Sequence, residues 1–225
     1  MGVFAMLVIA LVAADAEPAA SESTPAQEEV TAKRAVERVL SFVLEAETRV
    51  GSVHFDREGK GLELKDVRIA NPKGFKEGDA IAAKKVRVEA DPKSLFSREP
   101  LVHLVEVEGP TVNAETTLGR GSNLKRLMKS ADRFSDKKLL KMLPQKEWRI
   151  EKGVLRESTV NLSSDFPKQS TTRTLDDIEM TFPGRDGKGI RADEAMVKFL
   201  GRLARELELV DEDDPIETLI DLLRK

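Results

Sequence analysis

Cysteine and tyrosine are absent from the 225-residue chain, and it contains only two histidines and one tryptophan. The lack of cysteine excludes disulfides, thiolate metal sites, a cysteine nucleophile and a lipidated N-terminal cysteine. Any Ser-His-Asp triad, and most zinc sites, would have to use His54 or His103. We therefore expect a non-catalytic protein.

The chain also lacks an excess of one charge. It has 37 Lys and Arg against 40 Asp and Glu, a formal net charge of −3, which gives the whole chain no nucleic-acid signature. Hydrophobic residues make up 40% of the sequence, enough for one globular core or two small ones. A domain of this size folds without disulfides or structural metals.

A long hydrophobic run is missing as well. The run over residues 3–14 is twelve residues long, whereas a membrane-spanning helix needs about 20. This length is typical of a signal-peptide core, and Ala14-Asp15-Ala16 supplies a small-x-small cleavage pattern. We expect residues 1–16 to be a signal peptide or short membrane anchor, residues 17–27 to be a flexible spacer, and the protein to be exported.

Residues 28–225 are expected to form one α+β domain. The apolar spacing around Val36, Leu40 and Val43 predicts a helix over residues 28–47. Alternating strands are then expected within residues 49–55, 62–69, 84–90, 101–108 and 111–116. Tight turns between such strands favour antiparallel meanders. The alternation slips by one residue at Lys65 and Asp66, which indicates a β-bulge.

The second half of the chain turns helical and then returns to strands. Helices are expected over residues 119–134, with Ser122 as N-cap, and over 136–143, 192–210 and 215–225. Strand character appears between Trp148 and Leu162 and over residues 175–182, before a glycine loop at 184–189. The domain is thus divided into a helix plus β-meander (28–117), a basic helical insert (118–144), a second β part (145–190) and C-terminal helices (191–225).

A family resemblance rests on six segments that follow in order. They are VGSVHF, GLELKDVRIANPKGF, KKVRVEADPKSLFS, LVEVEGPTVNAE, GSNLKRLM and LDDIEMTFPGRDGKGIRADEAMVKFLGRL. In this order they resemble the AsmA-like family of bacterial envelope proteins, and the chain looks like a small exported member. The resemblance implies a curved antiparallel β-sheet flanked by amphipathic helices. It also implies a role in lipid homeostasis or transport, in the periplasm or at the periplasmic face of a membrane.

Strand alternation places apolar side chains on one face of the expected sheet. One hypothesis is that this face binds or shields lipid acyl chains in an apolar groove. The groove residues would be Leu62, Leu64, Val67, Ile69, Val86, Val88, Val105 and Val107. The alternative is an ordinary core filled by the chain's own helices. The protein would then be a structural or interaction module, an assembly partner in the cell envelope.

Basic residues concentrate in residues 120–149, which hold ten Lys or Arg and three acidic residues. The candidates for contact with anionic headgroups are Lys125, Arg126, Lys129, Lys137, Lys138 and Lys141. The alternative is a solvated helix face. Aromatic residues are not interleaved with these cations, so we expect no nucleic-acid partner. The expected partners are phospholipid or a membrane surface, and a protein of the envelope.

Weak catalytic and metal-binding patterns are also present. Ser122 and Lys125 fit the Ser-x-x-Lys pattern of some acylases, but the partner motifs are missing and a capping role for Ser122 is the simpler interpretation. His54 and His103 would lie in different strands and could meet across the sheet, but two ligands do not complete a zinc site. We expect no catalytic residue, no metal and no cofactor.

Overall fold

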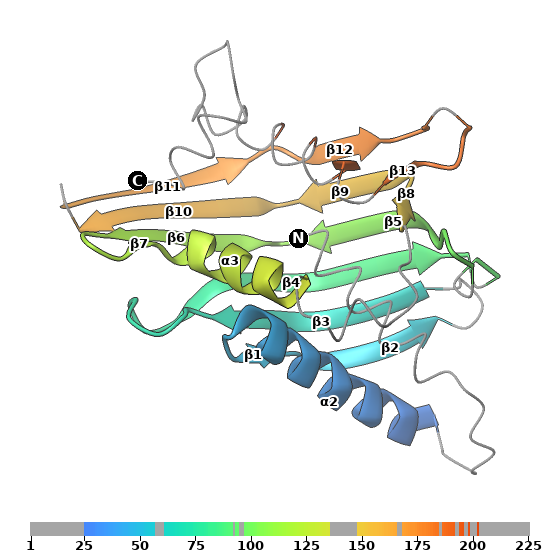
Figure 1. Cartoon of the computed structure of the whole chain (residues 1–225), viewed down its shortest axis with the longest axis horizontal. Helices are drawn as coiled ribbons and strands as arrows, with labels where there is room; N and C mark the ends of the chain where they lie inside the picture. Colours follow the sequence, from blue (N-terminus) through green and yellow to red (C-terminus); the bar gives the residue numbers. More distant parts are fainter. Residues whose placement is uncertain are drawn as a thin grey trace.

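The computed structural model describes residues 25–56, 61–91, 93–94, 97–135, 148–165, 168–184, 186–191, 194–195, 198 and 202. The fold class is confirmed: these residues form an α+β structure with one curled, open half-barrel sheet (Figure 1). Residues 1–24, the helices expected over 136–143 and 215–225, and most of the helix expected over 192–210 lie outside the described residues.

Two helices lie on the same side of the sheet (Figure 1). They are α2 (Pro25–Leu44) and α3 (Asn123–Ser135). The predicted apolar stripe of α2 is buried, since Val36, Leu40 and Val43 are at most 2% exposed. Glu45 ends the helix in the left-handed conformation, with φ of +51°. A left-handed residue after the last helical position is a common helix terminator.

Among the described residues, thirteen strand segments make up the sheet. They are β1 (Thr48–Arg49), β2 (Ser52–Asp56), β3 (Gly61–Ala70), β4 (Asp79–Ala90), β5 (Leu101–Glu108), β6 (Thr111–Thr117), β7 (Gly121–Ser122), β8 (Arg149–Ile150), β9 (Lys152–Arg156), β10 (Ser158–Asp165), β11 (Lys168–Leu175), β12 (Ile178–Thr181) and β13 (Ile190–Arg191). Most join end to end into six long strands, in the spatial order β1/β2, β3, β4, β5/β6, β8/β9/β10 and β11/β12. The short strands β7 and β13 pair with β6 and β8.

Neighbouring long strands run antiparallel, with one exception. The long strand β5/β6 pairs in parallel with β8/β9/β10. Parallel neighbours need a crossover connection of a dozen or more residues. Here the crossover is the segment that contains α3, which leaves the sheet after β7 and returns at β8.

One row of residues crosses the six long strands roughly at right angles. Lys65 opposes Lys85 and Val67 opposes Ala83, so Asp66 lies opposite Lys84. The pairing registers of the other strands extend this row to both edges of the sheet. The row consists of Gly51, Asp66, Lys84, Gly109, Glu157 and Asp176. We call this row the crease.

The alternation of buried residues slips at the crease in all six long strands. The buried residues on either side of it are three positions apart instead of two. These pairs are Val50 and Val53, Leu64 and Val67, Ala83 and Val86, Val107 and Pro110, Leu155 and Ser158, and Leu175 and Ile178. We call the face that carries these residues the inner face, and the opposite face the outer face. The slip keeps the inner face continuous on both sides of the crease.

The backbone is left-handed at the crease in three of the six long strands. Asp66, Gly109 and Glu157 have left-handed φ values of +50°, +58° and +52°. A left-handed residue within a strand turns the following side chains to the other face, and here it does so without the extra residue of a β-bulge, because Asp66 still lies opposite Lys84. At Gly51 a Cβ atom would lie 2.9 Å from Cβ of Asp66, so the crease requires glycine there. The slip predicted at Lys65 and Asp66 is confirmed as one member of a feature that spans the sheet. The β-bulge expected there is wrong, because the register between β3 and β4 is unbroken across Asp66 and shifts only between Ile69 and Ala70.

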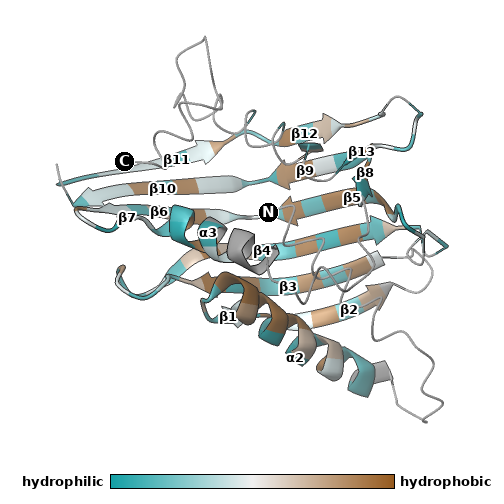
Figure 2. Cartoon of the chain, viewed as in Figure 1, coloured by the Kyte–Doolittle hydropathy of each residue, from teal (hydrophilic) through white to brown (hydrophobic). Residues whose placement is uncertain are grey.

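The main core lies between the inner face and α2. It joins Val36 and Leu40 of the helix to buried side chains of β2, β3, β4, β5, β8, β9 and β12. Trp148, Phe182 and Ala195 complete it. Figure 2 shows the hydrophobic residues concentrated in α2 and in the strands on the β2, β5 and β12 side of the crease.

Two strands differ from the sequence expectation. β4 begins at Asp79, before the expected start, and β11 was not expected at all. The first residues of β4 include Ala80, Ala82 and Ala83, which give no clear alternation. β11 is rich in Ser and Thr and is exposed at seven of its eight positions, so no hydrophobic pattern marks it.

Candidate functional site

The eight groove candidates lie together on the inner face, and almost all are buried. Seven are only 1–6% exposed, namely Leu62, Leu64, Val67, Ile69, Val86, Val88 and Val107. Val105 is half-buried and packs against the same core. Ile69 belongs to a smaller cluster with Ala80 and Leu127 of α3. The structure thus brings all eight to one face and covers seven of them.

The core is least covered at a few positions on one side of the crease. Phe55, Val105, Met180 and Ile190 are half-buried and pack against the main core. They come from β2, β5, β12 and β13.

The β1/β2 edge of the sheet is closed by side chains of α2. Ser41 Oγ and Glu37 Oε1 accept hydrogen bonds from the backbone N–H groups of Thr48 and Val50, each at 2.8 Å. Lys33 Nζ donates to the carbonyl of Gly51 at 3.0 Å.

The closure continues one helical turn earlier along α2. There Glu29 Oε1 lies 2.8 Å from Nδ1 of His54. Glu29, Lys33, Glu37 and Ser41 are spaced by four residues, so they form one stripe along the helix. We call them the edge stripe.

Asn123 closes a second, internal edge. β4 pairs with β6 no further than Val112, and β7 pairs with β6 only from Thr116, which leaves residues 113–115 of that edge without a neighbouring strand. The Asn123 side chain fills the place of a peptide group: its Nδ2 donates to the carbonyl of Asn113 at 2.6 Å, and its Oδ1 accepts from the N–H of Glu115 at 2.9 Å. Asn123 is fully buried, and the sequence analysis had not identified it. The residue predicted as the cap, Ser122, directly precedes α3.

The opposite edge of the sheet, β11, has a different environment. It pairs with β10 through eight consecutive residues without a register shift. Among the described residues it pairs with no other strand, and residues 168–174 are all exposed. We call β11 the open edge.

Ion pairs cover the outer face beside the crease. Lys85 bonds Glu108, and Arg156 lies 2.7 Å from Glu106 and 3.0 Å from Asp177. The hydrogen bond and charge of Lys85 lower the pKa of Glu108, and Glu108 in turn raises the pKa of Lys85. Exposed pairs of this kind contribute little to stability, which makes them a solvated surface.

The basic helix α3 has cations without partners. Arg126 and Lys129 are exposed and Lys125 is half-buried. None of the three side chains makes an ion pair or hydrogen bond in the described part of the chain. The apolar side chains Leu124 and Leu127 of the same helix face the smaller core cluster. The other membrane-surface candidates, Lys137, Lys138 and Lys141, lie outside the described residues.

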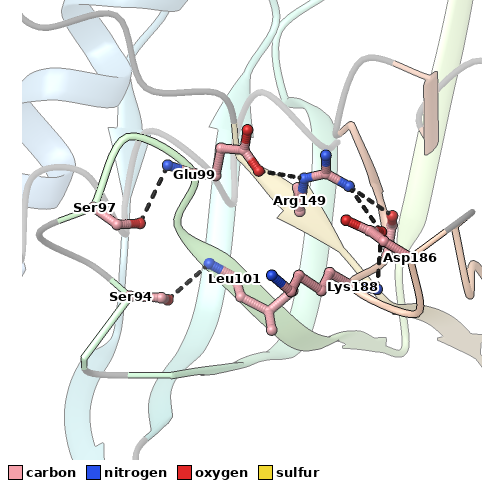
Figure 3. Close-up of polar contacts among 8 residues, drawn as sticks. Ser94, Ser97, Glu99, Leu101, Arg149, Asp186 and Lys188 are labelled. Carbon is pink, nitrogen blue, oxygen red and sulfur yellow. Dashed lines mark hydrogen bonds and ion pairs between the residues drawn. The ribbon is translucent and has the colours of Figure 1, made fainter.

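A polar cluster holds the glycine loop against the end of the sheet (Figure 3). Arg149 lies 2.9 Å from Glu99 and 3.3 Å from Asp186, whose pKa is lowered by the backbone N–H of Lys188. Ser94 Oγ accepts from the N–H of Leu101 at 2.8 Å and so closes a turn. These contacts fix loops, and no nucleophile and base face each other among them.

The two histidines are kept apart. His54 in β2 lies 2.8 Å from Glu29, whereas His103 in β5 lies 2.7 Å from Glu151. The long strands β3 and β4 separate them. Residues 25–202, where described, contain no group of three or more metal-ligating side chains. No described helix is long and apolar enough to cross a membrane.

Compared with known proteins, the chain matches no family model and no curated sequence.

Proposed function

We propose that this protein is a non-catalytic structural or interaction module of the cell envelope, with a filled core, that acts as an assembly partner. The observation that carries the proposal is the burial of the inner face, where seven of the eight groove candidates are at most 6% exposed. Side chains packed to this degree stabilise the fold and present no surface to a ligand. The envelope location rests on the AsmA-like resemblance and on the signal-peptide pattern of residues 1–16.

A second candidate function is the binding or shielding of lipid acyl chains on the same face. It is favoured by the curled, open sheet and by the half-buried apolar residues Phe55, Val105 and Met180. The unpaired cations of α3 would face anionic headgroups in this arrangement. Acyl chains would have to displace the side chains that now cover the inner face.

Native mass spectrometry of the full chain after gentle extraction separates the two functions. The filled core predicts the mass of the bare protein and an unchanged melting temperature after delipidation. The acyl-chain function predicts added phospholipid mass and a lower melting temperature once the lipid is removed. Pull-down from envelope fractions should recover a stoichiometric protein partner under the first function.

Substitution on the inner face gives a further test. Val86→Asp with Val88→Asp buries two carboxylates in the core, where neither has a partner. The filled core predicts loss of cooperative folding, measured by circular dichroism. A folded double variant that has lost bound lipid would instead favour the groove. Val30→Asp is the matched control, because Val30 is 50% exposed and should leave folding intact.

The membrane-surface role of α3 is tested with vesicles. Arg126→Glu with Lys129→Glu should abolish co-sedimentation with phosphatidylglycerol vesicles if these cations contact headgroups. The control variant is Lys93→Glu, because Lys93 is an exposed cation outside α3. Equal co-sedimentation of both variants would leave α3 as a solvated helix face.

A further inference from the structure

We propose that the open edge, β11, pairs with β11 of a second copy of this chain. The two strands run antiparallel about a twofold axis at Thr172, so that two sheets join into one. This inference goes beyond the proposed function and does not depend on the filled core or on the envelope location. It rests on the exposure, register and charge pattern of β11.

The open edge has the properties of a strand-pairing surface. Edge strands present a row of unpaired backbone N–H and C=O groups, and natural proteins protect them with charged side chains, prolines, bulges or covering elements. Of these protections β11 carries two charged side chains, Lys168 and Arg173. Residues 168–175 contain no proline, and their pairing with β10 has no bulge. In the described residues no helix or strand covers the outer side of β11, whereas α2 closes the opposite edge. The polar side chains of β11 keep this edge soluble as a monomer.

Backbone geometry limits the register of a symmetric pair. Opposite residues in an antiparallel ladder either both exchange hydrogen bonds or both point away. A twofold axis between two residues would place a residue whose backbone groups point toward the second copy opposite one whose groups point away. The axis must therefore pass through a residue. The central choices are Thr171, Thr172 and Arg173.

Charge selects one of these registers. An axis at Arg173 places two guanidinium groups opposite each other, which is destabilising. An axis at Thr171 places Lys168 opposite Thr174. An axis at Thr172 places Lys168 opposite Asp176 of the second copy, and the symmetry repeats this ion pair at the other end.

The flanking residues are available for this register. Lys168 and Asp176 are both exposed, and neither side chain has a partner among the described residues. Thr172 lies opposite Thr172 of the second copy, and Ser170 opposite Thr174. Threonine pairs of this kind suit cross-strand contacts. The segment 168–176, which is β11 and the residue after it, is therefore self-complementary, with opposite charges at its two ends.

Cysteine cross-linking tests the register directly, because the chain has no cysteine of its own. Residues opposite each other in an antiparallel pair have Cα atoms about 4.5–5.5 Å apart, within the range that a disulfide spans. Thr172→Cys should give a disulfide-linked dimer of the full chain under mild oxidation. Thr174→Cys alone should not, because the two copies of residue 174 would be four positions, about 14 Å, apart.

Mixed variants keep the test independent of position 172. Ser170→Cys mixed with Thr174→Cys should cross-link, although neither variant does so alone. Equal cross-linking of Thr172→Cys and Thr174→Cys would indicate random collision and overturn the proposal. Failure of every combination, in variants whose circular dichroism matches the native protein, would also overturn it.

Charge reversal gives a second, reversible readout. Lys168→Asp or Asp176→Lys places like charges opposite each other twice, and we expect about tenfold weaker self-association in sedimentation. Mixing these two variants restores both ion pairs and should restore the dimer. Lys93→Asp is the control that should leave association unchanged. A native protein that stays monomeric at all concentrations, or a dimer insensitive to both reversals, contradicts the proposal.

Discussion

At the β1/β2 edge, α2 supplies hydrogen-bond partners for the backbone of the sheet, whereas at the β11 edge the described residues supply none. The closed edge lets the long strand β1/β2 carry the buried valines Val50 and Val53, because the helix that bonds the edge also covers the inner face. The open edge has no such cover, and its strand is accordingly built from Ser and Thr. Whether an edge is covered thus determines which side chains its strand can carry.

The largest effect is expected where α2 is anchored to the sheet. Leu40 is 1% exposed, and Leu40→Ala should lower the free energy of unfolding by about 2–5 kcal/mol through lost burial and a cavity. Denaturant unfolding measures this change. Thr172→Ala on the open edge should cost no more than about 1 kcal/mol, since it removes an exposed side chain with one exposed hydrogen bond, to Asn161. Equal losses at both positions would remove the contrast between the edges.

A smaller effect is expected at the two ends of the crease. Gly51→Ala brings a Cβ to within 2.9 Å of Cβ of Asp66, and overpacking of this kind costs about 1–3 kcal/mol. Asp176, at the other end of the crease, is exposed, so Asp176→Ala should be nearly neutral. Thermal unfolding of the two variants compares the ends. A neutral Gly51→Ala would show that the closed edge adapts freely.

The edge stripe itself can be opened one bond at a time. Glu37→Ala leaves the half-buried N–H of Val50 without its acceptor, which should cost about 1–2 kcal/mol. Hydrogen exchange at Val50 should accelerate toward the rate of an uncovered edge amide. Glu37→Gln keeps a carbonyl oxygen at this position and should recover most of the protection. Unchanged exchange in Glu37→Ala would mean that the bond does not protect the edge.

The smallest effect is expected midway between the edges, at Lys85 and Glu108 on the outer face. The lowered pKa of Glu108 gives stability that is present above its unfolded value, about 4.3, and is lost as the pH falls through the folded value. The raised pKa of Lys85 gives stability that is present below its unfolded value, about 10.4, and is lost as the pH rises through the folded value.

Lys85→Gln should therefore lower the melting temperature slightly near neutral pH and have no effect in strong acid. Lys93→Gln, which removes an exposed cation without a side-chain partner, should show no such pH dependence. A difference between Lys85→Gln and the native protein that persists at pH 2 would contradict this assignment.

The sequence predicted the apolar parts of this fold well because burial leaves a periodic signal. The strand over residues 101–108 was predicted at its observed bounds, and the slip at Asp66 was read from its neighbours. The open edge was missed because an uncovered strand has no apolar face to reveal it. Asn123 was missed because its role depends on Asn113 and Glu115, whose backbone positions follow from the tertiary fold.

The same limits apply to the candidate surfaces. Alternation assigned all eight groove candidates to one face, but it carries no information about what covers that face. The edge stripe has the spacing of an ordinary solvated helix face, and only the position of β1 and β2 beside α2 reveals its hydrogen bonds. The charges of Lys168 and Asp176 suggest a pairing surface only when β11 is known to be the edge strand of the sheet.

The crease also has a consequence for how such a sheet can change during evolution. A deletion of one residue next to Gly109 would move the inner-face side chains of the rest of that strand to the outer face, and the outer-face side chains to the inner face. The neighbouring strands would keep their side-chain orientation. Length changes are therefore tolerable in the turns and costly along this line. In each of the six long strands the alternation of inner and outer side chains slips at the crease. The position of the slip must therefore be kept in all six strands together.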